Sequence, residues 1–525
     1  MRVMPSGIAV AMVWAAAVAA LAADPTTNPW YRAGRAAVAA ARADVGSVDR
    51  ARNVILFVGD GMGITTVTAA RIRDGQLRGQ PGEEHLLEFE TLPFTALAKT
   101  YSTDFQVSES AGTITAMLTG VKTRSGVLGV DETVAQGDVA AAAAGSIPTL
   151  FEQAEDRGLW TGIVTTTRVT HATPAGCYAH TPNRNWESDG ELPAAAREAG
   201  TKDIARQLVE FAHGDGIEVV LGGGRATFLP GTASDPEYPE QTGARRDGRD
   251  LVAEWKTKYP EGVYAWNRDQ LLAVDPAKTR HVLGLFEPSH MRYEADRAQD
   301  PAGEPSLAEM TARALDVLER APNGWVLLVE GGRIDHGHHA GNAYRALGET
   351  IELSRAVRVA RERVKRDETL IVVTADHSHT LGFSGYPKRG NPILGLVRGS
   401  SGEGPVSDQV VEDLSGRPYT TLGYANGPGY PGASDQQPEG PKRFPHEPRS
   451  AQGVTRGRPD LAAVATDAPD YLQESTLPLR AETHGGEDVP IYAGGPGAAL
   501  FHGVREQNYV YHALAGALGW TQRPE

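Results

Sequence analysis

Cysteine is almost absent from the sequence. Cys177 is the only one in 525 residues, so the chain cannot form a disulfide within itself. The chain is long enough to bury a large core, and 40% of its residues are hydrophobic, as in ordinary folded proteins. Its stability must therefore come from that core and from any bound metal ions. Cys177 itself is expected to be a small buried residue.

Long hydrophobic runs are confined to the start of the sequence. Arg2, the apolar stretch Ile8–Leu21 and a small-x-small cleavage site at 20–22 predict a signal peptide over residues 1–22. The alternative is an uncleaved anchor, although the stretch is short for a membrane span. The polar end Trp520–Glu525 offers no hydrophobic tail for a lipid anchor. We expect an exported protein, periplasmic or extracellular, with no membrane span in the mature chain. Export without disulfides is typical of bacteria.

Positive charge is also scarce. The chain has 51 Lys and Arg against 66 Asp and Glu, which gives a formal net charge of −15. This balance argues against nucleic acid as a bulk partner, because binding it requires basic side chains that neutralise phosphates. A site for an anionic substrate would need strong local positive charge, and bound metal ions can supply it.

The order of apolar and helical stretches predicts the fold. Short apolar runs separated by helical stretches are typical of buried parallel strands with helices on both faces. The expected fold class is therefore α/β, a three-layer α/β/α sandwich around a large, mostly parallel sheet. The runs are Val54–Val58, Gly162–Thr166, Glu218–Leu221, Trp325–Val329 and Thr369–Thr374.

Composition also divides the chain. An Ala- and Arg-rich helical arm is expected at residues 23–50, followed by the α/β core at 51–384. Residues 385–480 are rich in Gly, Pro, Ser and Asp, and a structureless loop of that length is uncommon inside a compact domain. We therefore predict a loop-rich insertion there, with the C-terminal part of the core at 481–525.

Three of the predicted strands end in an acidic residue. Asp60, Glu330 and Asp376 each follow one of the apolar runs. The carboxyl ends of parallel strands share one edge of a sheet, so these side chains should converge. Converging carboxylates repel one another, and their pKa values rise unless multivalent cations bind between them. Any one of them could be a turn or helix-cap acid, but the three together predict a metal site.

Histidines strengthen this prediction. Asp335 and His339 are spaced i, i+4, so on a helix they share one face and could bind one zinc ion. His377 directly follows Asp376, whereas His484 lies far on in the sequence, where a lone histidine is more often structural. A mixed set of Asp and His favours zinc, while carboxylates and hydroxyls alone favour magnesium.

Ser110 is a candidate nucleophile. It lies in Ser108–Met117, a segment typical of a loop entering a helix, and a helix N-terminus favours an anion such as an alkoxide or a phosphate. An ordinary N-cap serine is the commoner use of such a residue. A serine hydroxyl is a weak nucleophile until its proton is removed, which a coordinated metal ion can achieve. No Gly-x-Ser-x-Gly elbow supports a Ser-His-Asp alternative.

Together these segments resemble the alkaline phosphatases, especially the animal-type branch. The likeness covers nearly the whole mature chain and is densest at Arg52–Tyr386 and Ala481–Ala515. It implies hydrolysis of phosphate monoesters to an alcohol and inorganic phosphate. The segments that carry it are Gly59–Gly63, Ser110–Ala111, Thr165–Gly176, His180, Asn183–Trp186, Leu221–Arg225, Val329–His339, Thr374–His379 and Glu482–His484.

The resemblance also implies a role for each site residue. Ser110 would form a phosphoseryl intermediate, and Arg184 would bind two phosphate oxygens. Two in-line steps then predict net retention at phosphorus. Two zinc ions and one magnesium ion are implied, with Glu109, His171 and His336 around them. The first zinc would be held by Asp335, His339 and His484, the second by Asp376, His377, Asp60 and Ser110, and the magnesium by Asp60, Thr173 and Glu330.

The same branch implies a fourth metal site, for calcium. Its donors would be Glu237, the Phe286 carbonyl, Glu287 and Glu304, all of them oxygen atoms, as calcium prefers. Glu304 would stand where the family has Asp. The alternative is an ordinary acidic surface.

The chain departs from the family at some points. Glu109 stands where Asp is usual, and its longer side chain could hold Arg184 differently. The disulfides of the animal members are missing. The insertion at 385–480 resembles their crown region only weakly, through Pro418–Tyr424. The family resemblance also implies a homodimer.

Two other functions fit part of the pattern. A phosphodiesterase or sulfatase of the same superfamily would share the metal-binding strand ends, but Asn183–Trp186 favours the monoesterase. A phosphate- or metal-binding protein without catalysis would need no nucleophile beside the metals. The expected partners are therefore small phosphate monoesters, and no nucleic acid.

Overall fold

The structure is a computed structural model that describes residues 24–45, 49–400, 402 and 404–520. The predicted signal peptide at residues 1–22 lies outside these described residues. Within them, no helix combines the length and the apolar character needed to cross a bilayer.

One large sheet forms the middle of the molecule. Its strands are β1 (Asn53–Gly59), β2 (Phe94–Lys99), β3 (Trp160–Arg168), β4 (Val219–Gly223), β5 (Val263–Ala265), β6 (Val282–Leu285), β7 (Trp325–Gly331), β8 (Thr369–Ala375), β14 (Val489–Gly494) and β15 (Gly503–Glu506). They lie in the order β15-β2-β14-β8-β1-β7-β3-β4-β6-β5. Only β14 runs antiparallel to its neighbours, β2 and β8. The mostly parallel sheet expected from the sequence is confirmed.

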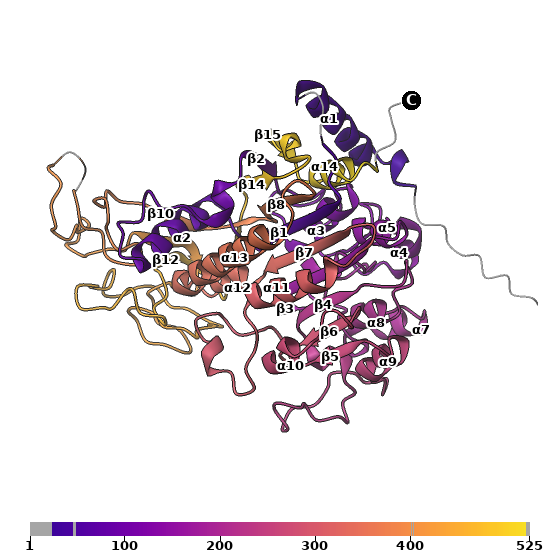
Figure 1. The fold of residues 1–525 in the computed structure, drawn as a ribbon. Coiled ribbons are helices and arrows are strands. Elements are labelled where there is room, and N and C mark those ends of the chain that lie inside the picture. The colour runs from indigo at the N-terminus through magenta and orange to yellow at the C-terminus, as the bar shows by residue number, and fades with distance from the viewer. Residues whose placement is uncertain (1–23, 46–48, 401, 403, 521–525) are drawn as a thin grey trace, which may run out of the picture.

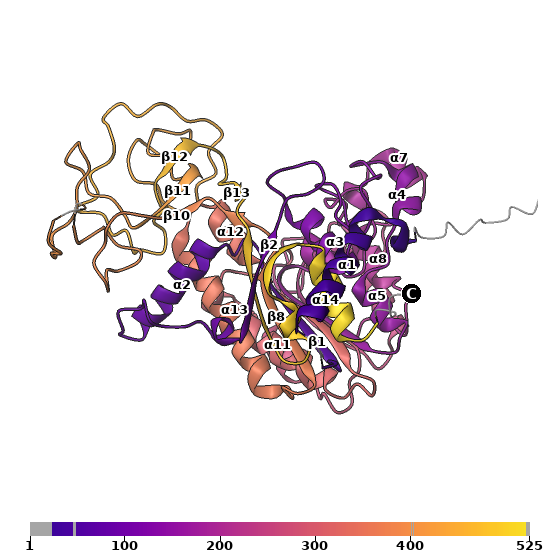
Figure 2. The same ribbon diagram turned by 90° about the horizontal axis from the view of Figure 1, so that it is seen from above.

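Helices cover both faces of this sheet. Their bounds are α1 Pro29–Val45, α2 Ile64–Leu77, α3 Ser110–Thr119, α4 Val139–Gly145, α5 Leu150–Glu155, α6 Ala172–Ala175, α7 Ala194–Glu198, α8 Ile204–Val209, α9 Leu251–Lys258, α10 Arg268–Leu272, α11 Leu307–Leu318, α12 Arg333–His339, α13 Ala343–Arg363 and α14 Tyr509–Ala517. Helices α2, α11 and α12 pack on α13, while α1 and α3 pack on α14. Figure 2 shows these two groups on opposite sides of β1 and β8, which confirms the three-layer architecture.

The central strands show why the sequence pattern is continuous rather than alternating. All seven residues of β1 are buried, because β7 and β8 flank it and helices cover both of its faces. Every side chain of Val54–Val58 can then be apolar, and burying each one stabilises the fold by about 1.5–3 kcal/mol. The expected runs all coincide with strands of this sheet, namely β1, β3, β4, β7 and β8.

Residues 385–480 contain little regular structure and project from one end of the molecule (Figure 1). At their base lies a three-stranded sheet of β10 (Leu381–Phe383), β11 (Leu422–Gly427) and β12 (Ser475–Pro478). β10 lies just before residue 385, so the core and the insertion share this sheet. The short strand β9 (Ser378–His379) pairs with β13 (His484–Gly485). That pairing brings His484 close to the end of β8.

Candidate metal centre and nucleophile

The three acidic strand ends lie at the same edge of the sheet. Asp60 follows β1, Glu330 lies in β7 and Asp376 follows β8, and β1 pairs with both other strands. The register places Val58 opposite Glu330, so the acids stand at nearly the same level. All three are 0% exposed. The predicted convergence of carboxylates is therefore present.

Two of these carboxylates each have one oxygen without the hydrogen-bond donor that a buried charge requires. Oδ2 of Asp376 and Oε1 of Glu330 are buried, and within the described residues neither accepts a hydrogen bond. Burial and the neighbouring acids raise the pKa of Asp60 well above its usual range, and burial raises that of Asp376. A buried unpaired polar atom costs about 1–3 kcal/mol, and a charged one more. The site fits multivalent cations bound between these oxygens.

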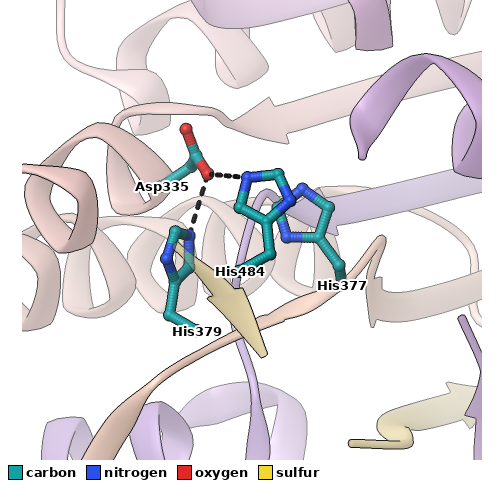
Figure 3. Close-up of side chains that lie close together, drawn as sticks. All are labelled: Asp335, His377, His379 and His484. Carbon is teal, nitrogen blue, oxygen red and sulfur yellow. Dashed lines mark hydrogen bonds and ion pairs between the residues drawn. The ribbon is translucent and has the colours of Figure 1, made fainter. Parts of the chain in front are cut away.

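Asp335 lies inside a group of histidines (Figure 3). It is on α12, with His339 one turn later, while His484 comes from β13. Oδ1 of Asp335 is 3.3 Å from Nε2 of His339 and 3.4 Å from Nε2 of His484. Although burial opposes it, these histidines hold the pKa of Asp335 well below its usual range. The three residues expected to hold the first zinc are thus brought together.

Backbone contacts set the orientation of these imidazoles. Nδ1 of His339 is 2.5 Å from the carbonyl oxygen of Glu482, and Nδ1 of His484 is 2.8 Å from that of Ser108. A carbonyl can only accept, so each Nδ1 carries the proton. Both Nε2 atoms are then free to bind a metal, and they lie 3.2 Å apart.

The sequence pattern did not single out His379, which also lies in this group. Its Nε2 atom is 2.8 Å from Oδ1 of Asp335, and its Nδ1 atom is 2.5 Å from Oε2 of Glu482 (Figure 3 draws the first contact). Although burial opposes it, the two carboxylates raise the pKa of His379 to about 10. A cationic His379 would position Asp335 rather than bind a metal. The signal in the sequence was its place two residues after His377.

Ser110 lies beside the second group of predicted ligands. It is the first residue of α3 and is 3% exposed. Its Oγ atom is 3.3 Å from Nε2 of His377 and 3.4 Å from Oδ1 of Asp60. One ligand atom from each of Asp60, Asp376 and His377 lies within 4.8 Å of the others. The hydroxyl and three potential ligands therefore meet at the N-terminus of a helix.

Glu109 joins this helix to Arg184. It is the N-cap of α3 and accepts hydrogen bonds from the backbone N–H groups of Ala111, Gly112 and Gly126, at 3.0, 2.8 and 2.8 Å. Its Oε2 atom also accepts from Nη1 of Arg184. The longer side chain, which departs from the family pattern, thus still reaches the arginine and caps the helix as well.

The predicted magnesium ligands also lie near Asp60, which belongs to both groups. Atoms of Asp60, Glu330 and His171 lie within 4.8 Å of one another. Thr173, on α6, is 0% exposed, and its Oγ1 atom has no hydrogen-bond partner in the described chain. His171 accepts a hydrogen bond from Nη2 of Arg184 at 2.9 Å. The ring of His336 lies 5.7 Å from that of His171, centroid to centroid.

The residues expected to bind calcium also lie near one another, at the far end of the sheet. Glu237 accepts a hydrogen bond from Nη2 of Arg225 at 3.2 Å, and Glu287 directly follows Phe286 at the end of β6. Burial and the acids around it raise the pKa of Glu287, and the same causes raise that of Glu304 to about 9. An acidic group of this kind fits a cation better than an ordinary surface does.

Asp300 belongs to this acidic group and was not predicted. Nε of Arg292 is 3.1 Å from Oδ1 of Asp300 and 3.3 Å from Oε1 of Glu287, so one guanidinium joins both acids. Oδ2 of Asp300 and Oε2 of Glu304 are buried without a hydrogen-bond partner among the described residues. Asp300 lies in a loop four residues before Glu304, and sequence spacing alone gives no sign of that approach.

A family model identifies the family of this chain. The model of the alkaline phosphatases matches residues 51–520. The chain belongs to the alkaline phosphatase family. It is 46% identical over 474 residues to an alkaline phosphatase of Gadus morhua, across 89% of this chain and 92% of that protein. It is 44% identical over 473 residues to the tissue-nonspecific isozyme of Homo sapiens, across 89% and 83%.

Solved structures agree with this membership. The alkaline phosphatase of Thermus thermophilus is 25% identical, with a TM-score of 0.63, and the match covers 90% of this chain and 93% of that one. The alkaline phosphatase of the Antarctic bacterium TAB5, 20% identical with a TM-score of 0.57, shares the fold across 91% of this chain and 100% of that one. Membership of the alkaline phosphatase family confirms the expected enzyme class, a metal-dependent phosphate monoester hydrolase.

Proposed function

We propose that Ser110 is the nucleophile of this alkaline phosphatase and that Arg184 binds the phosphate of the substrate. One observation carries the proposal: Oγ of Ser110 lies 3.3 Å from His377 and 3.4 Å from Asp60. A serine that only capped a helix would need no buried acids and imidazoles around its hydroxyl. Arg184 lies beside it, held by Glu109, and its planar fork suits phosphate oxygens.

We further propose four metal sites. Cations bound at the three sites around Ser110 would neutralise the phosphate and lower the pKa of the serine hydroxyl, whereas the fourth site lies at the far end of the sheet. The donor types favour zinc at the two Asp/His groups and magnesium or calcium at the oxygen-rich ones. Glu109, His171, His336 and His379 would surround the catalytic ligands. The proposed donors are Asp335, His339 and His484 for the first zinc; Asp376, His377, Asp60 and Ser110 for the second; Asp60, Thr173 and Glu330 for magnesium; and Glu237, the Phe286 carbonyl, Glu287, Asp300 and Glu304 for calcium.

In the proposed reaction Oγ of Ser110 loses its proton to solvent and attacks phosphorus. The ester P–O bond breaks, its electron pair leaves with the alcohol oxygen, and that oxygen takes up a proton. Water then attacks the phosphoserine, the P–Oγ bond breaks, Oγ takes up a proton released by that water, and inorganic phosphate is released. The N-terminus of α3 and the Arg184 fork stabilise the charge on the equatorial oxygens. Two in-line displacements predict net retention at phosphorus.

The proposal is tested by hydrolysis of an aryl phosphate by the full chain. Activity should disappear after chelation and return with zinc and magnesium added together. Ser110→Ala should abolish it without unfolding the chain, and Ser108→Ala, two residues away, should keep it. Full activity in Ser110→Ala would refute the proposed nucleophile. Faster hydrolysis of a bis-aryl phosphate or an aryl sulfate would favour a phosphodiesterase or a sulfatase.

We also propose that the enzyme is exported and works as a homodimer on small phosphate monoesters. Support for export comes from the N-terminal sequence pattern, and support for the dimer from family resemblance. N-terminal sequencing of secreted protein should show cleavage after residue 22, and light scattering should give twice the chain mass. A protein retained with its N-terminus, or a monomer, would contradict these two points.

A further inference from the structure

A second group of acids lies at the opposite edge of the sheet from the proposed catalytic residues. Glu155 ends α5, Asp215 lies in the loop after α8, and Glu218 directly precedes β4. The backbone N–H of Thr161, near the start of β3, donates to Oε2 of Glu218 at 2.7 Å. The group therefore lies at the amino ends of strands whose carboxyl ends face the catalytic edge. One carboxylate oxygen from each acid lies within 4.8 Å of the others.

Two of these acids are almost completely inaccessible to solvent. Glu155 is 2% exposed and Glu218 is 0% exposed. Burial raises the pKa of both groups, and their acidic neighbours raise it further. Glu155 is also the last residue of α5, where the helix carbonyls point outward, so the helix dipole opposes its negative charge.

One oxygen of Glu155 lacks a hydrogen-bond donor among the described residues. Its Oε1 atom accepts a hydrogen bond from Oγ1 of Thr161 at 2.6 Å, but Oε2, although buried, accepts none from the residues described. This free oxygen faces the turn at Gly214, where a Cβ atom would lie 2.5 Å from it. A buried charged oxygen without a partner is costly. Either a bound cation or a proton shared with Glu218 must satisfy it.

The charges of the group do not balance. Arg280 contacts Oε1 of Glu218 at 2.9 Å and also contacts Asp215. Three ionised carboxylates and this one guanidinium leave two negative charges, which one divalent cation would neutralise. Because all the donors are carboxylate oxygens, the group suits a hard cation such as calcium. Asp215 is half exposed, which gives such an ion a path from solvent.

We propose that Glu155, Asp215 and Glu218 form a further divalent-cation site of the calcium type. The ion would bind between the end of α5 and the start of β4 and so fasten the helix to the sheet. This site is separate from the four metal sites proposed above and does not depend on the proposed reaction.

The test is calcium binding to the full chain, saturated with zinc and magnesium. Equilibrium dialysis should show one calcium ion fewer per chain in the double variant Glu155→Gln/Glu218→Gln than in the wild type. Asp156→Asn, the acid next to Glu155 but outside the group, should bind as much calcium as the wild type. Hydrolysis of an aryl phosphate should stay the same in all three proteins. Equal calcium binding in the double variant and the wild type would refute the site and leave a shared proton as the explanation.

Two single variants keep the test decisive if the double variant folds poorly. Asp215→Asn changes only an accessible ligand and should weaken calcium binding about 10-fold or more, since fewer charged ligands lower affinity. Arg280→Gln removes a competing positive charge and should tighten calcium binding. Terbium luminescence can measure ion binding to both variants. The ring centroid of Trp160 lies 4.6 Å from Cζ of Arg280, so this indole can sensitise a terbium ion bound at the site. Unchanged affinity in both variants would overturn the proposal.

Discussion

Nε2 of His379 lies 2.8 Å from Oδ1 of Asp335, an oxygen that also faces the two histidines proposed to share a zinc ion with it. His379 is fixed from its other side by Glu482, at 2.5 Å from Nδ1. A partner of this kind sets the direction of a ligand oxygen without binding the metal itself. Such outer contacts typically change metal affinity or activity 10- to 100-fold when they are removed.

Replacing His379 by Ala should therefore weaken zinc binding about 10- to 100-fold. The measurement is the zinc concentration that restores aryl phosphate hydrolysis to the chelated enzyme. At saturating zinc most of the activity should return, because Ser110 and Arg184 are untouched. His502→Gln, at a side chain that forms hydrogen bonds with Ala499 and Arg505, is the control and should need no extra zinc. Identical zinc requirements in both variants would mean that His379 does not position Asp335.

Replacing Glu109 by Gln should loosen Arg184. The amide can still accept a hydrogen bond at the start of α3, but it loses the charge that pairs with the guanidinium. A hydrogen bond to a charged group contributes about 1.5–3 kcal/mol, so kcat/KM should fall about 10- to 100-fold and inhibition by inorganic phosphate should weaken. Glu109→Asp keeps the charge, so its kcat/KM should lie between those of the wild type and Glu109→Gln.

Glu132→Gln is the matched control for Glu109, because Glu132 is a partly buried acid whose side chain forms no hydrogen bond or ion pair with Arg184 in the described chain. Its kcat/KM and its inhibition by phosphate should match the wild type. If Glu109→Gln retained both properties, the arginine would have to be positioned by His171 alone.

The sequence predicted the centre of the fold better than its edges. Continuous apolar runs such as Val54–Val58 mark strands buried on both faces, and these strands set the place of Asp60, Glu330 and Asp376. β2, β14 and β15 gave no such signal. β2 is partly exposed and alternates, and the antiparallel placement of β14 depends on its pairing with strands far away in the sequence.

The site shows the same limit. Residues next to a strand end, such as Asp376 and His377, follow from local pattern because the sheet itself places them. Asp300 does not, since its loop must fold back onto Glu287 before the two acids meet around Arg292. Its role depends on an approach between loops, which neither propensity nor spacing encodes.

Asp300 should contribute to the affinity of the proposed calcium site. Replacing it by Asn removes a buried charge that faces Glu287, so calcium affinity should fall about 10-fold. The measurement is the rise in melting temperature with free calcium, made in the Glu155→Gln/Glu218→Gln background so that the other acidic group does not contribute. Asp275→Asn, outside this acidic group, should leave the calcium response unchanged. If calcium raised the melting temperature of Asp300→Asn as much as that of the unsubstituted background, Asp300 would not be a ligand of the calcium site.

Glu349 should make the stability of the folded chain depend on pH. It is buried on α13, and burial raises its pKa to about 8. The folded value lies above the unfolded one, about 4.3, so the folded state holds the proton more tightly. The stability that this group contributes is complete below the unfolded pKa and is lost as pH rises towards 8.

Glu349→Gln keeps an acceptor for the backbone N–H of Glu294, which lies 2.5 Å away, but cannot ionise. The melting temperature of Glu349→Gln, relative to wild type, should therefore rise steadily between about pH 5 and pH 9. Glu362→Gln, exposed on the same helix, should show a constant difference across that range. A Glu349→Gln difference that also stayed constant would mean that the buried carboxyl keeps one protonation state throughout.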